Sequence, residues 1–383
     1  MDLLMTEEER MLQAAVREFA ERELKPRARE TDEKEEFSWE AWRGMASLGL
    51  AGIGIDPAFG GGGGTHRQMV VAVEEVSRGD ASAAVSLIAH RSLGLQSIYQ
   101  FGNEEQKSKY VPGAASGEKI MAWALTEPGS GSDAAAMQTT ATRRDGNFYL
   151  NGSKLFTTNG DIADAVIVFA SHDKELRHRA VSAFIVDKDA PGLRVHKQQG
   201  KMGMRGSTTV EMTFEDTPVP VENLLGEERH GFRYAMDILD SSRIAIAAQC
   251  VGIAQAAFEA AVRYSQQRQT FGKPISEHQA IQFALADMAT DIFASRSMTF
   301  LAATLEDQGL PYLEEASMAK LYASEACFRV ASKAVQIHGG YGYFKESDVE
   351  RYFRDSRVTS IYEGTSEVQR IVIGRQVVDR YRI

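Results

Sequence analysis

The chain reads Ile361-Tyr362-Glu363-Gly364-Thr365-Ser366-Glu367-Val368-Gln369-Arg370 close to its C-terminus, and this stretch is the most informative part of the sequence. Glu363 stands between an apolar pair, Ile361 and Tyr362, and a glycine followed by two hydroxyl residues. Desolvation by such neighbours raises the pKa of a carboxyl group towards that of a usable general base. Because a helical pattern follows, a helix cap or first-turn carboxylate is the alternative interpretation.

A second polar segment, Thr126-Glu127-Pro128-Gly129-Ser130-Gly131-Ser132-Asp133, follows the apolar run of residues 120–125. The proline fixes the chain, the glycines let backbone approach a ligand, and the hydroxyls offer hydrogen bonds, which together favour a ligand-binding loop. A plain turn between strands would look similar. The segment has neither the Lys-Ser/Thr ending of a P-loop nor the Gly-x-Gly-x-x-Gly of a Rossmann turn, so neither nucleotide fingerprint applies.

Together the two segments resemble the acyl-CoA dehydrogenase family, which combines a T-E-P-G-x-G-S-D loop with a Y-E-G-T segment near the C-terminus. The resemblance covers essentially the whole chain. It continues in order through Asn151-Gly152-Ser153-Lys154, Thr157-Thr158-Asn159-Gly160, residues 201–207, residues 268–273 with His278-Gln279, and residues 336–342. Residues 205–216 and 363–369 are most similar to short-chain, butyryl-type members.

The composition is that of a globular protein. With 383 residues, 43% hydrophobic and 25% charged, the chain is long enough for two or three domains. Its net charge of -10 argues against a nucleic-acid-binding surface. Two cysteines, Cys250 and Cys327, stand in helical contexts and indicate buried thiols in a reducing compartment rather than a disulfide framework.

Targeting and metal-binding signals are missing from the sequence. There is no apolar run of about 18 residues, so we expect no membrane span. Residues 1–7 have neither a basic n-region nor an Arg-rich transit pattern, and Tyr381-Arg382-Ile383 is not a peroxisomal address, so we expect a cytoplasmic protein. The eight histidines are scattered without the spacing of a zinc motif, so we expect no metal site.

The chain divides into three blocks, and we predict a mainly α fold with a β middle domain. Residues 1–120 read as helical, with a capping box at Thr6 and Glu9, and the glycine tract at 60–64 is predicted to be a surface loop. Residues 121–225 contain short β-rich runs, typical of a small β-barrel or sandwich, with hairpin signals at Asp145-Gly146 and Asn151-Gly152. Residues 226–383 return to helix and read as a four-helix bundle, the organisation that the family resemblance also implies.

The resemblance implies a flavoenzyme of lipid metabolism. It implies FAD, bound without a Rossmann domain, and oxidation of a short-chain acyl-CoA to the trans-2-enoyl-CoA, as in fatty acid beta-oxidation. Glu363 matches the base that removes the pro-R α-proton, while FAD N5 accepts the β-hydride, since no amino-acid side chain accepts hydride. The thioester oxygen would accept hydrogen bonds from the Glu363 backbone N–H and a ribityl hydroxyl. Electrons would pass to an electron-transfer flavoprotein.

Isovaleryl-type members of the family draw their base from another helix, near a D-x-x-R segment. Here that segment is Asp240-Ser241-Ser242-Arg243, with serine where the alternative glutamate would sit, so only Glu363 is available. A salt-bridged helix face is the plain interpretation of Asp240 and Arg243. By resemblance we assign both to substrate contact, with Arg243 near the CoA moiety and with Ser132 and Gly364 as further substrate contacts.

Flavin contacts carry over position by position from the family. The isoalloxazine ring is expected at Trp123, Ala124, Leu125, Thr126, Gly131, Ser132, Phe156, Thr157 and Thr158, where the family commonly has tryptophan in place of Phe156. The pyrophosphate and adenine are expected at Arg268, Thr270, Phe271 and Gln279, and arginine suits phosphate because its guanidinium pairs bidentately. The diphosphate of an FAD in the adjacent subunit is expected at Gln336, Ile337, His338, Gly339 and Gly340. Thr365 and Glu367 are expected at the adenosine portion. His338 is given no proton-transfer role.

Substrate choice rests on fewer residues. Glutaryl-type members carry an arginine in the region that is Ala83, Ala84 and Val85 here, which disfavours a dicarboxylate. His90 and Arg91 either reach the acyl pocket or lie on a solvated helix face. A short straight-chain acyl-CoA is favoured, with short branched or cyclic acyl groups next.

Two other functions are alternatives to the dehydrogenase. A flavin acyl-CoA oxidase is disfavoured because the oxidases of this superfamily are usually much longer. A non-catalytic acyl-CoA-binding scaffold would be expected to lose the base or the flavin contacts, and both are retained. If residues 336–340 serve a neighbouring FAD, a dimer is the minimum assembly, and the family implies a homotetramer.

Overall fold

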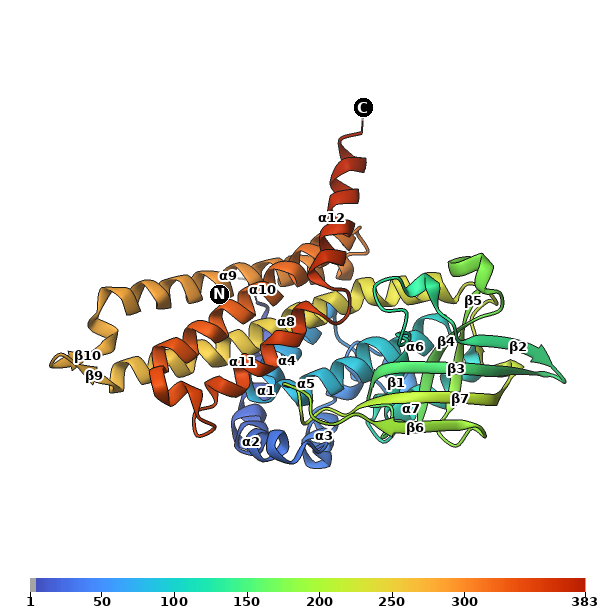
Figure 1. Cartoon of the computed structure of the whole chain (residues 1–383), viewed down its shortest axis with the longest axis horizontal. Helices are drawn as coiled ribbons and strands as arrows, with labels where there is room; N and C mark the ends of the chain where they lie inside the picture. Colours follow the sequence, from blue (N-terminus) through green and yellow to red (C-terminus); the bar gives the residue numbers. More distant parts are fainter. Residues whose placement is uncertain (1–4, 383) are drawn as a thin grey trace.

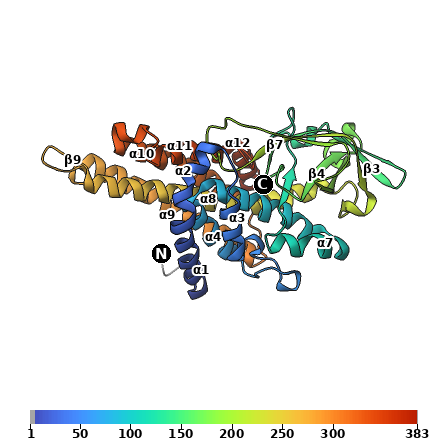
Figure 2. The ribbon, with the colours of Figure 1, turned by 90° about the horizontal axis from the view of Figure 1, so that it is seen from below.

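The structure is a computed structural model that describes residues 5–382, and it runs from helices through strands to helices again (Figure 1). The first part is helical, with short π and 3-10 segments between helices. Its α-helices are α1 (Glu7–Phe19), α2 (Lys25–Lys34), α3 (Trp39–Ser47), α4 (His66–Gly79), α5 (Ala81–Ile88), α6 (Gln96–Phe101) and α7 (Glu104–Ala115). Of these, α4, α5 and α6 pack directly against the long C-terminal helices (Figure 2).

Local sequence sets where these helices begin. The predicted capping box is confirmed: the Thr6 hydroxyl accepts from the Glu9 N–H, and the Glu9 carboxylate accepts from the Thr6 N–H. The glycine tract at 60–64 lies in the connection before α4. A Cβ at Gly61 would stand 2.2 Å from the Ile55 carbonyl oxygen, so close backbone packing, and not only loop freedom, requires glycine there.

The middle part is a single eight-stranded sheet. Its strands are β1 (Met121–Ala124), β2 (Thr140–Arg144), β3 (Asn147–Thr158), β4 (Ala165–Ser171), β5 (Val181–Asp187), β6 (Leu193–Lys197), β7 (Thr209–Pro220) and β8 (Leu224–Leu225). The order is β6-β7-β3-β2-β4-β5-β8, and β1 pairs in parallel with β4. Every residue of β4 is buried, as expected of a central strand covered on both faces.

One of the two hairpin predictions is confirmed and the other is wrong. Asp145 and Gly146, both with positive φ, form the turn between β2 and β3. Asn151-Gly152 instead lies inside β3, where the register against β7 shifts. A Cβ at Gly152 would lie 2.6 Å from the Thr139 hydroxyl, so this glycine serves a bulge and a close contact, not a turn.

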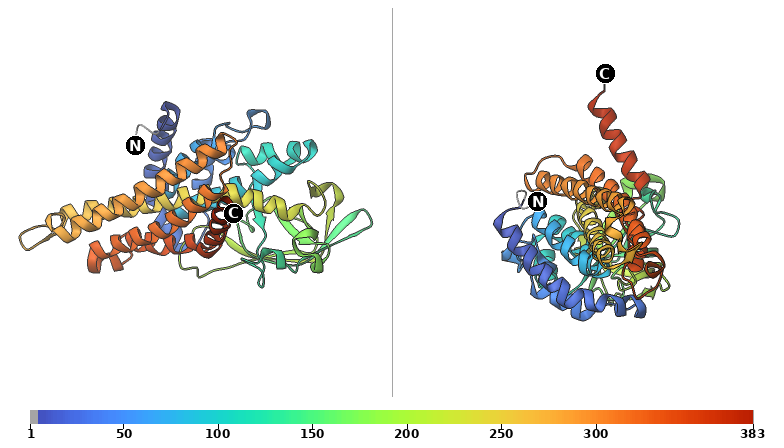
Figure 3. Two further views of the ribbon diagram at one scale, coloured as in Figure 1. Left: turned by 90° about the horizontal axis from the view of Figure 1, so that it is seen from above. Right: turned by 90° about the vertical axis from the view of Figure 1, so that its left-hand side faces the viewer.

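The last part is a bundle of long helices. Its members are α8 (Gly231–Gln267), α9 (Gln279–Asp307), α10 (Leu313–His338), α11 (Val349–Ser356) and α12 (Ser366–Arg380), with a short hairpin of β9 (Gln269–Thr270) and β10 (Lys273–Pro274) after α8. The small residues of α8 allow close approach of a neighbouring helix: a Cβ at Gly252 would lie 2.2 Å from the Glu74 carbonyl oxygen of α4. Helix α12 leaves the bundle and projects from it (Figures 1 and 3).

By length and composition alone, helix α8 is long and apolar enough to cross a membrane. In the fold, however, 78% of its most apolar window is buried inside the protein. Its apolar residues are therefore accounted for by packing against the helices and strands around it.

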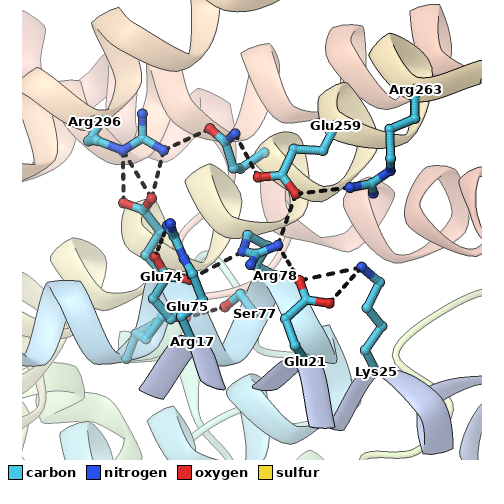
Figure 4. Close-up of polar contacts among 12 residues, drawn as sticks. Arg17, Glu21, Lys25, Glu74, Glu75, Ser77, Arg78, Glu259, Arg263 and Arg296 are labelled. Atoms are coloured by element: carbon cyan, nitrogen blue, oxygen red, sulfur yellow. Dashed lines mark hydrogen bonds and ion pairs between the residues drawn. The ribbon is translucent and has the colours of Figure 1, made fainter. Parts of the chain in front are cut away.

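Buried charges join the N-terminal helices to the bundle (Figure 4). Arg296 on α9 pairs with Glu74 on α4 at 2.6 Å and also donates to Gln255 on α8. Gln255 continues the chain of contacts to Glu259, which accepts from Arg78 at 2.9 Å. Because partners from three helices, α4, α8 and α9, satisfy one another, the network fixes how the N-terminal helices pack against the bundle.

Removing one member of this network should be costly. We expect Arg296→Met to lower the free energy of unfolding by about 3–5 kcal/mol, because Glu74 would remain buried without its partner. Urea denaturation of the two proteins measures the difference. Arg22→Met, at the exposed pair with Glu18, is the matched control and should change little. Equal effects of the two substitutions would contradict a structural role for the network.

Candidate active site around Glu363

The predicted base lies on a turn with unusual backbone geometry between the 3-10 segment Arg357–Ser360 and α12. Glu363 has φ of 49° and Gly364 has φ of 92°, so both occupy the left-handed region. A Cβ at position 364 would be strained at that φ and would also lie 2.6 Å from the Gln369 side-chain nitrogen, so glycine is strongly favoured there. A glutamate held in this conformation is strained, and strain of this kind gathers at functional sites.

The Glu363 carboxyl group is partly buried between α8, α10 and its own turn. The Ser242 hydroxyl of α8 donates to its Oε2 at 2.5 Å. Burial raises the pKa of Glu363 to about 7, against the lowering effects of the Ser242 hydrogen bond and of the charges of Lys320 and Arg243. A carboxylate with this pKa is matched to proton abstraction near neutral pH.

Position 242 touches the same carboxylate that the sequence singled out. The serine standing where the alternative glutamate would sit is thus adjacent to Glu363 in space, although 121 residues separate them. The two positions face one site, and in this chain one supplies the carboxylate and the other a hydrogen bond to it.

Asp240 and Arg243 form an ion pair on α8. Arg243 Nη1 donates to Asp240 Oδ1 at 2.7 Å, and the arginine side chain is 6% exposed. Burial raises the pKa of Asp240 to about 6 in spite of that pairing. In this conformation the Arg243 charge acts inside the protein, near Glu363, so its predicted contact with CoA stays a prediction.

The loop at 126–133 is anchored at one side and open at the other. Glu127 is buried, accepts from the N–H groups of Gln138 and Thr139, and pairs with the fully buried Lys154 at 2.7 Å. A Cβ at Gly131 would meet no atom within 4 Å, and Ser132 is exposed. The ion pair thus fixes a loop whose outer side is free to meet a ligand.

The residues expected at the isoalloxazine ring have the features that such a ring needs. Phe156 is 62% exposed with a positive φ, an unusual state for a large aromatic residue. Trp123 Nε1 and Thr157 Oγ1 are buried without a hydrogen-bond partner in the described part of the chain. An exposed aromatic face beside unpaired donors fits a planar, hydrogen-bonding ring system. The neighbouring predicted contacts are Ala124, Leu125, Thr126 and Thr158, on or next to β1 and β3.

The residues expected at the phosphates and adenine are elsewhere. Arg268, Thr270, Phe271 and Gln279 lie on the β9–β10 hairpin and the start of α9, at the end of the bundle away from the sheet (Figures 1 and 3). Phe271 is 97% exposed. One chain therefore does not bring its ring-binding and phosphate-binding candidates together.

The end of α10 lies at that same end of the molecule (Figure 1). Gln336, Gly339 and Gly340 are exposed, and a Cβ at either glycine would meet nothing within 4 Å. Ile337 is buried, and His338 stacks on Tyr264 with ring centroids 4.3 Å apart. The glycines leave room for a ligand to approach, whereas His338 is held by the protein itself.

At the start of α12, Thr365 is the N-cap, because its hydroxyl accepts from the Val368 N–H. Glu367 is exposed in the first turn. The helix-cap alternative for this segment is thus realised by Thr365, one residue after Gly364, and not by Glu363.

His90 and Arg91 are both buried, so the alternative that they lie on a solvated helix face is wrong. His90 bonds the Ala114 carbonyl and accepts from the Met121 N–H, and Arg91 donates to the Ile53 carbonyl and to Gln96. Burial lowers the pKa of His90 to about 4, so the ring is neutral. In residues 5–382 no group of histidine, cysteine, aspartate and glutamate side chains could hold a metal ion.

Lys320 was not among the predicted site residues. It is fully buried on α10, and its ammonium group donates to the Gly364 carbonyl at 2.6 Å. Its spacing carried a signal: Ala316, Ala323 and Cys327 share the same helix face and are buried with it. A lysine on an otherwise small, apolar helix face must find hydrogen-bond acceptors or opposite charges for its ammonium group inside the protein.

The raised pKa of Glu363 has a consequence for stability. The folded protein holds a proton between pH 4.5 and about 7 that the unfolded chain releases, so this group's contribution to stability falls as pH rises through that range. We expect Glu363→Gln to be more stable than the wild type at pH 8, by about 1–3 kcal/mol, and the gain to vanish near pH 4.5. Urea denaturation at the two pH values measures this. Glu367→Gln, exposed in the first turn of α12, should show no such gain, and a pH-independent gain for Glu363→Gln would contradict the assignment.

Comparisons with known proteins identify the family of the chain. Three family models match in order: the N-terminal domain of acyl-CoA dehydrogenase over residues 6–118, the middle domain over 122–217 and the C-terminal domain over 229–378. A short-chain specific acyl-CoA dehydrogenase of Clostridium acetobutylicum is 44% identical, covering 98% of this chain and 100% of its own length.

Solved structures give the same result. Butyryl-CoA dehydrogenase of Megasphaera elsdenii is 43% identical with a TM-score of 0.95, covering 98% of this chain and 99% of its own. A chain from a study of the electron transferring flavoprotein of Acidaminococcus fermentans is 45% identical with a TM-score of 0.96, covering 98% of both chains. Structures of this family include FAD complexes. The chain belongs to the acyl-CoA dehydrogenase family, FAD-dependent oxidoreductases that act on the CH–CH group of their donors.

Proposed function

We propose that this protein oxidises a short straight-chain acyl-CoA to the trans-2-enoyl-CoA, with Glu363 removing the α-proton. The observation that carries the proposal is the Glu363 carboxylate itself, which burial brings to a pKa of about 7 on a strained turn facing α8 and α10. Bound FAD supplies the acceptor for the β-hydride.

The chain's own groups account for the proton and its electrostatics. Glu363 takes the α-proton, and the Ser242 hydroxyl stays bonded to Oε2 and orients the carboxylate. The Glu363 N–H is the donor proposed for the thioester oxygen, where negative charge develops as the proton leaves. Exposed Phe156, with unpaired Trp123 Nε1 and Thr157 Oγ1, supports the proposed ring site on β1 and β3.

Two observations support a short, uncharged acyl group. Ala83, Ala84 and Val85 are buried and offer no cation for a distal carboxylate. The relatives reported above include a short-chain specific enzyme and a butyryl-CoA dehydrogenase. Short branched or cyclic acyl groups are the alternative, and the test below separates them.

An electron-transfer flavoprotein is the proposed electron acceptor, as the similar chain from Acidaminococcus supports. The proposed setting is fatty acid beta-oxidation in the cytoplasm. A complete flavin site needs a second subunit, since Arg268 and Phe271 lie at the opposite end of the bundle from β1 and β3 (Figure 1). We propose a dimer as the smallest active unit and a homotetramer, a dimer of dimers, as the assembly.

An anaerobic titration with butyryl-CoA tests the reaction. The visible absorbance of bound flavin should bleach in the wild type and not in Glu363→Gln, because the amide cannot accept the α-proton. The variant should retain its flavin, which shows that only chemistry was lost. If flavin is bound but only branched, cyclic or longer thioesters bleach it, the short straight-chain assignment is wrong. Bleaching by Glu363→Gln at the wild-type rate would overturn the role of Glu363.

Mixed subunits test the shared site. Arg268→Met and Glu363→Gln should each be inactive or nearly so as homo-oligomers. After they are refolded together, a heterodimer would hold one intact site, with Glu363 from one subunit and Arg268 from the other. Random pairing should restore about a quarter of the wild-type activity. Glu363→Gln mixed with Glu363→Ala is the control and should restore none. Verified heterodimers without activity would mean that Arg268 serves its own subunit.

A further inference from the structure

An ammonium group buried behind the catalytic turn has no part in the reaction derived so far. Lys320 on α10 is fully buried, and its Nζ donates to the Gly364 carbonyl oxygen at 2.6 Å. Burying a charge without satisfying it is costly, so a lysine is kept in such a place only where its hydrogen bonds and nearby charges hold it.

The same carbonyl receives a second donor from the other side of the turn. Gln369 is fully buried on α12. Its Nε2 donates to the backbone carbonyl oxygen of Gly364 at 3.1 Å and to the backbone carbonyl oxygen of Glu363 at 3.4 Å. Side chains from α10 and α12 thus both donate to the carbonyl of one peptide group. That peptide adjoins the two residues whose backbone lies in the left-handed region.

Two hydrogen bonds to the same carbonyl help to hold a strained turn in place. A non-glycine residue in the left-handed region is strained, and it persists only where surrounding contacts fix it. The contacts from Lys320 and Gln369 end on Gly364, next to Glu363, so they act on the backbone that aims the carboxylate. Ser242 then orients the carboxylate itself from α8.

Lys320 acts on Glu363 through its charge as well as through its hydrogen bond. Burial lowers the pKa of Lys320 to about 8, and the groups that face it are Cys250 and Arg243 on α8 and Glu363 and Glu367 near the turn. In return, the lysine charge and the Arg243 charge oppose the rise of the Glu363 pKa that burial causes. Lys320 is therefore placed to set both the direction and the acidity of the base.

We propose that Lys320 is a positioning residue of the reaction, whose ammonium group fixes the Gly364 carbonyl and so holds Glu363 in its productive conformation. The inference rests on the proposed role of Glu363 as base.

The first variant is Lys320→Met, which keeps most of the side-chain volume and removes the charge and the donor. With the lysine charge gone, the pKa of Glu363 should rise, and the acid limb of the pH profile of kcat should move up by about 0.5–1 pH unit. At pH 7 kcat should fall at least tenfold, with part of the loss recovered at pH 9. The flavin content should remain at the wild-type level.

Lys201→Met is the matched control. Lys201 is likewise a mostly buried ammonium group with a pKa lowered to about 8, and it donates to the carbonyls of Met204 and Ser207. Glu363 is not among the groups that face it. Its loss should lower stability without moving the acid limb.

Two more variants separate charge from geometry. Lys320→Arg keeps the charge, so the acid limb should stay in place while kcat falls. Gln369→Leu removes a neutral donor to the same carbonyl, and it should lower kcat and leave the limb unmoved. The proposal is overturned if the acid limb of Lys320→Met coincides with that of the wild type, or if Lys201→Met shifts it equally.

A direct readout keeps the test independent of turnover. The infrared carboxyl band of Glu363, identified by its loss in Glu363→Gln, should titrate near pH 7 in the wild type and higher in Lys320→Met. If no acyl-CoA bleaches the wild-type flavin, the proposed function fails, while this titration still decides whether Lys320 acts on Glu363. An unchanged midpoint in folded Lys320→Met would overturn the inference by itself.

Discussion

The close contact of α8 with α4 is the constraint on which the other arrangements depend. Gly252 leaves no room for even a methyl group against the Glu74 carbonyl, so the two helices meet backbone to backbone. That approach brings the Glu74 carboxylate to Arg296 of α9, and through Gln255 it links the network to Glu259 and Arg78. With α8 seated in this way, Ser242 meets the Glu363 carboxylate. A side chain at position 252 would separate the N-terminal helices from the bundle and disturb the site at the same time.

Glu363, the proposed base, combines two unfavourable features that are useful together. Its backbone is strained and its carboxyl is partly desolvated, and each lowers the stability of the fold. The protein offsets these costs with contacts from three directions: Ser242 on α8, Lys320 on α10 and Gln369 on α12. No one element could hold Glu363 alone, which explains why the site lies where separate helices meet.

How much the sequence could predict depends on the range of the interactions involved. The capping box at Thr6 and the turn at Asp145-Gly146 rest on neighbours a few residues apart, and both predictions are confirmed. Asn151-Gly152 misled because a turn and a bulge both need a permissive backbone, and only the approach of Thr139 distinguishes them. His90 and Arg91 are buried by partners such as Met121 and Ile53, which no local pattern reveals. The family resemblance pointed to Glu363, and the apolar pattern of α10 marks Lys320 as buried, but the contact between Lys320 and the turn appears only when α10 and the turn are placed together.

Helix α8 also sets a distance. It runs unbroken for 37 residues from Gly231 to Gln267, with Ser242 in its first third and Arg268 just past its far end. At a rise of about 1.5 Å per residue, these two positions are held roughly 40 Å apart. Inserting one residue between them would lengthen the rod slightly but turn its far end by about 100°, which would point the tip hairpin in a new direction. In the shared site proposed above, this helix sets the distance between the ring-binding and the phosphate-binding residues, so its length is more constrained than that of the surface loops.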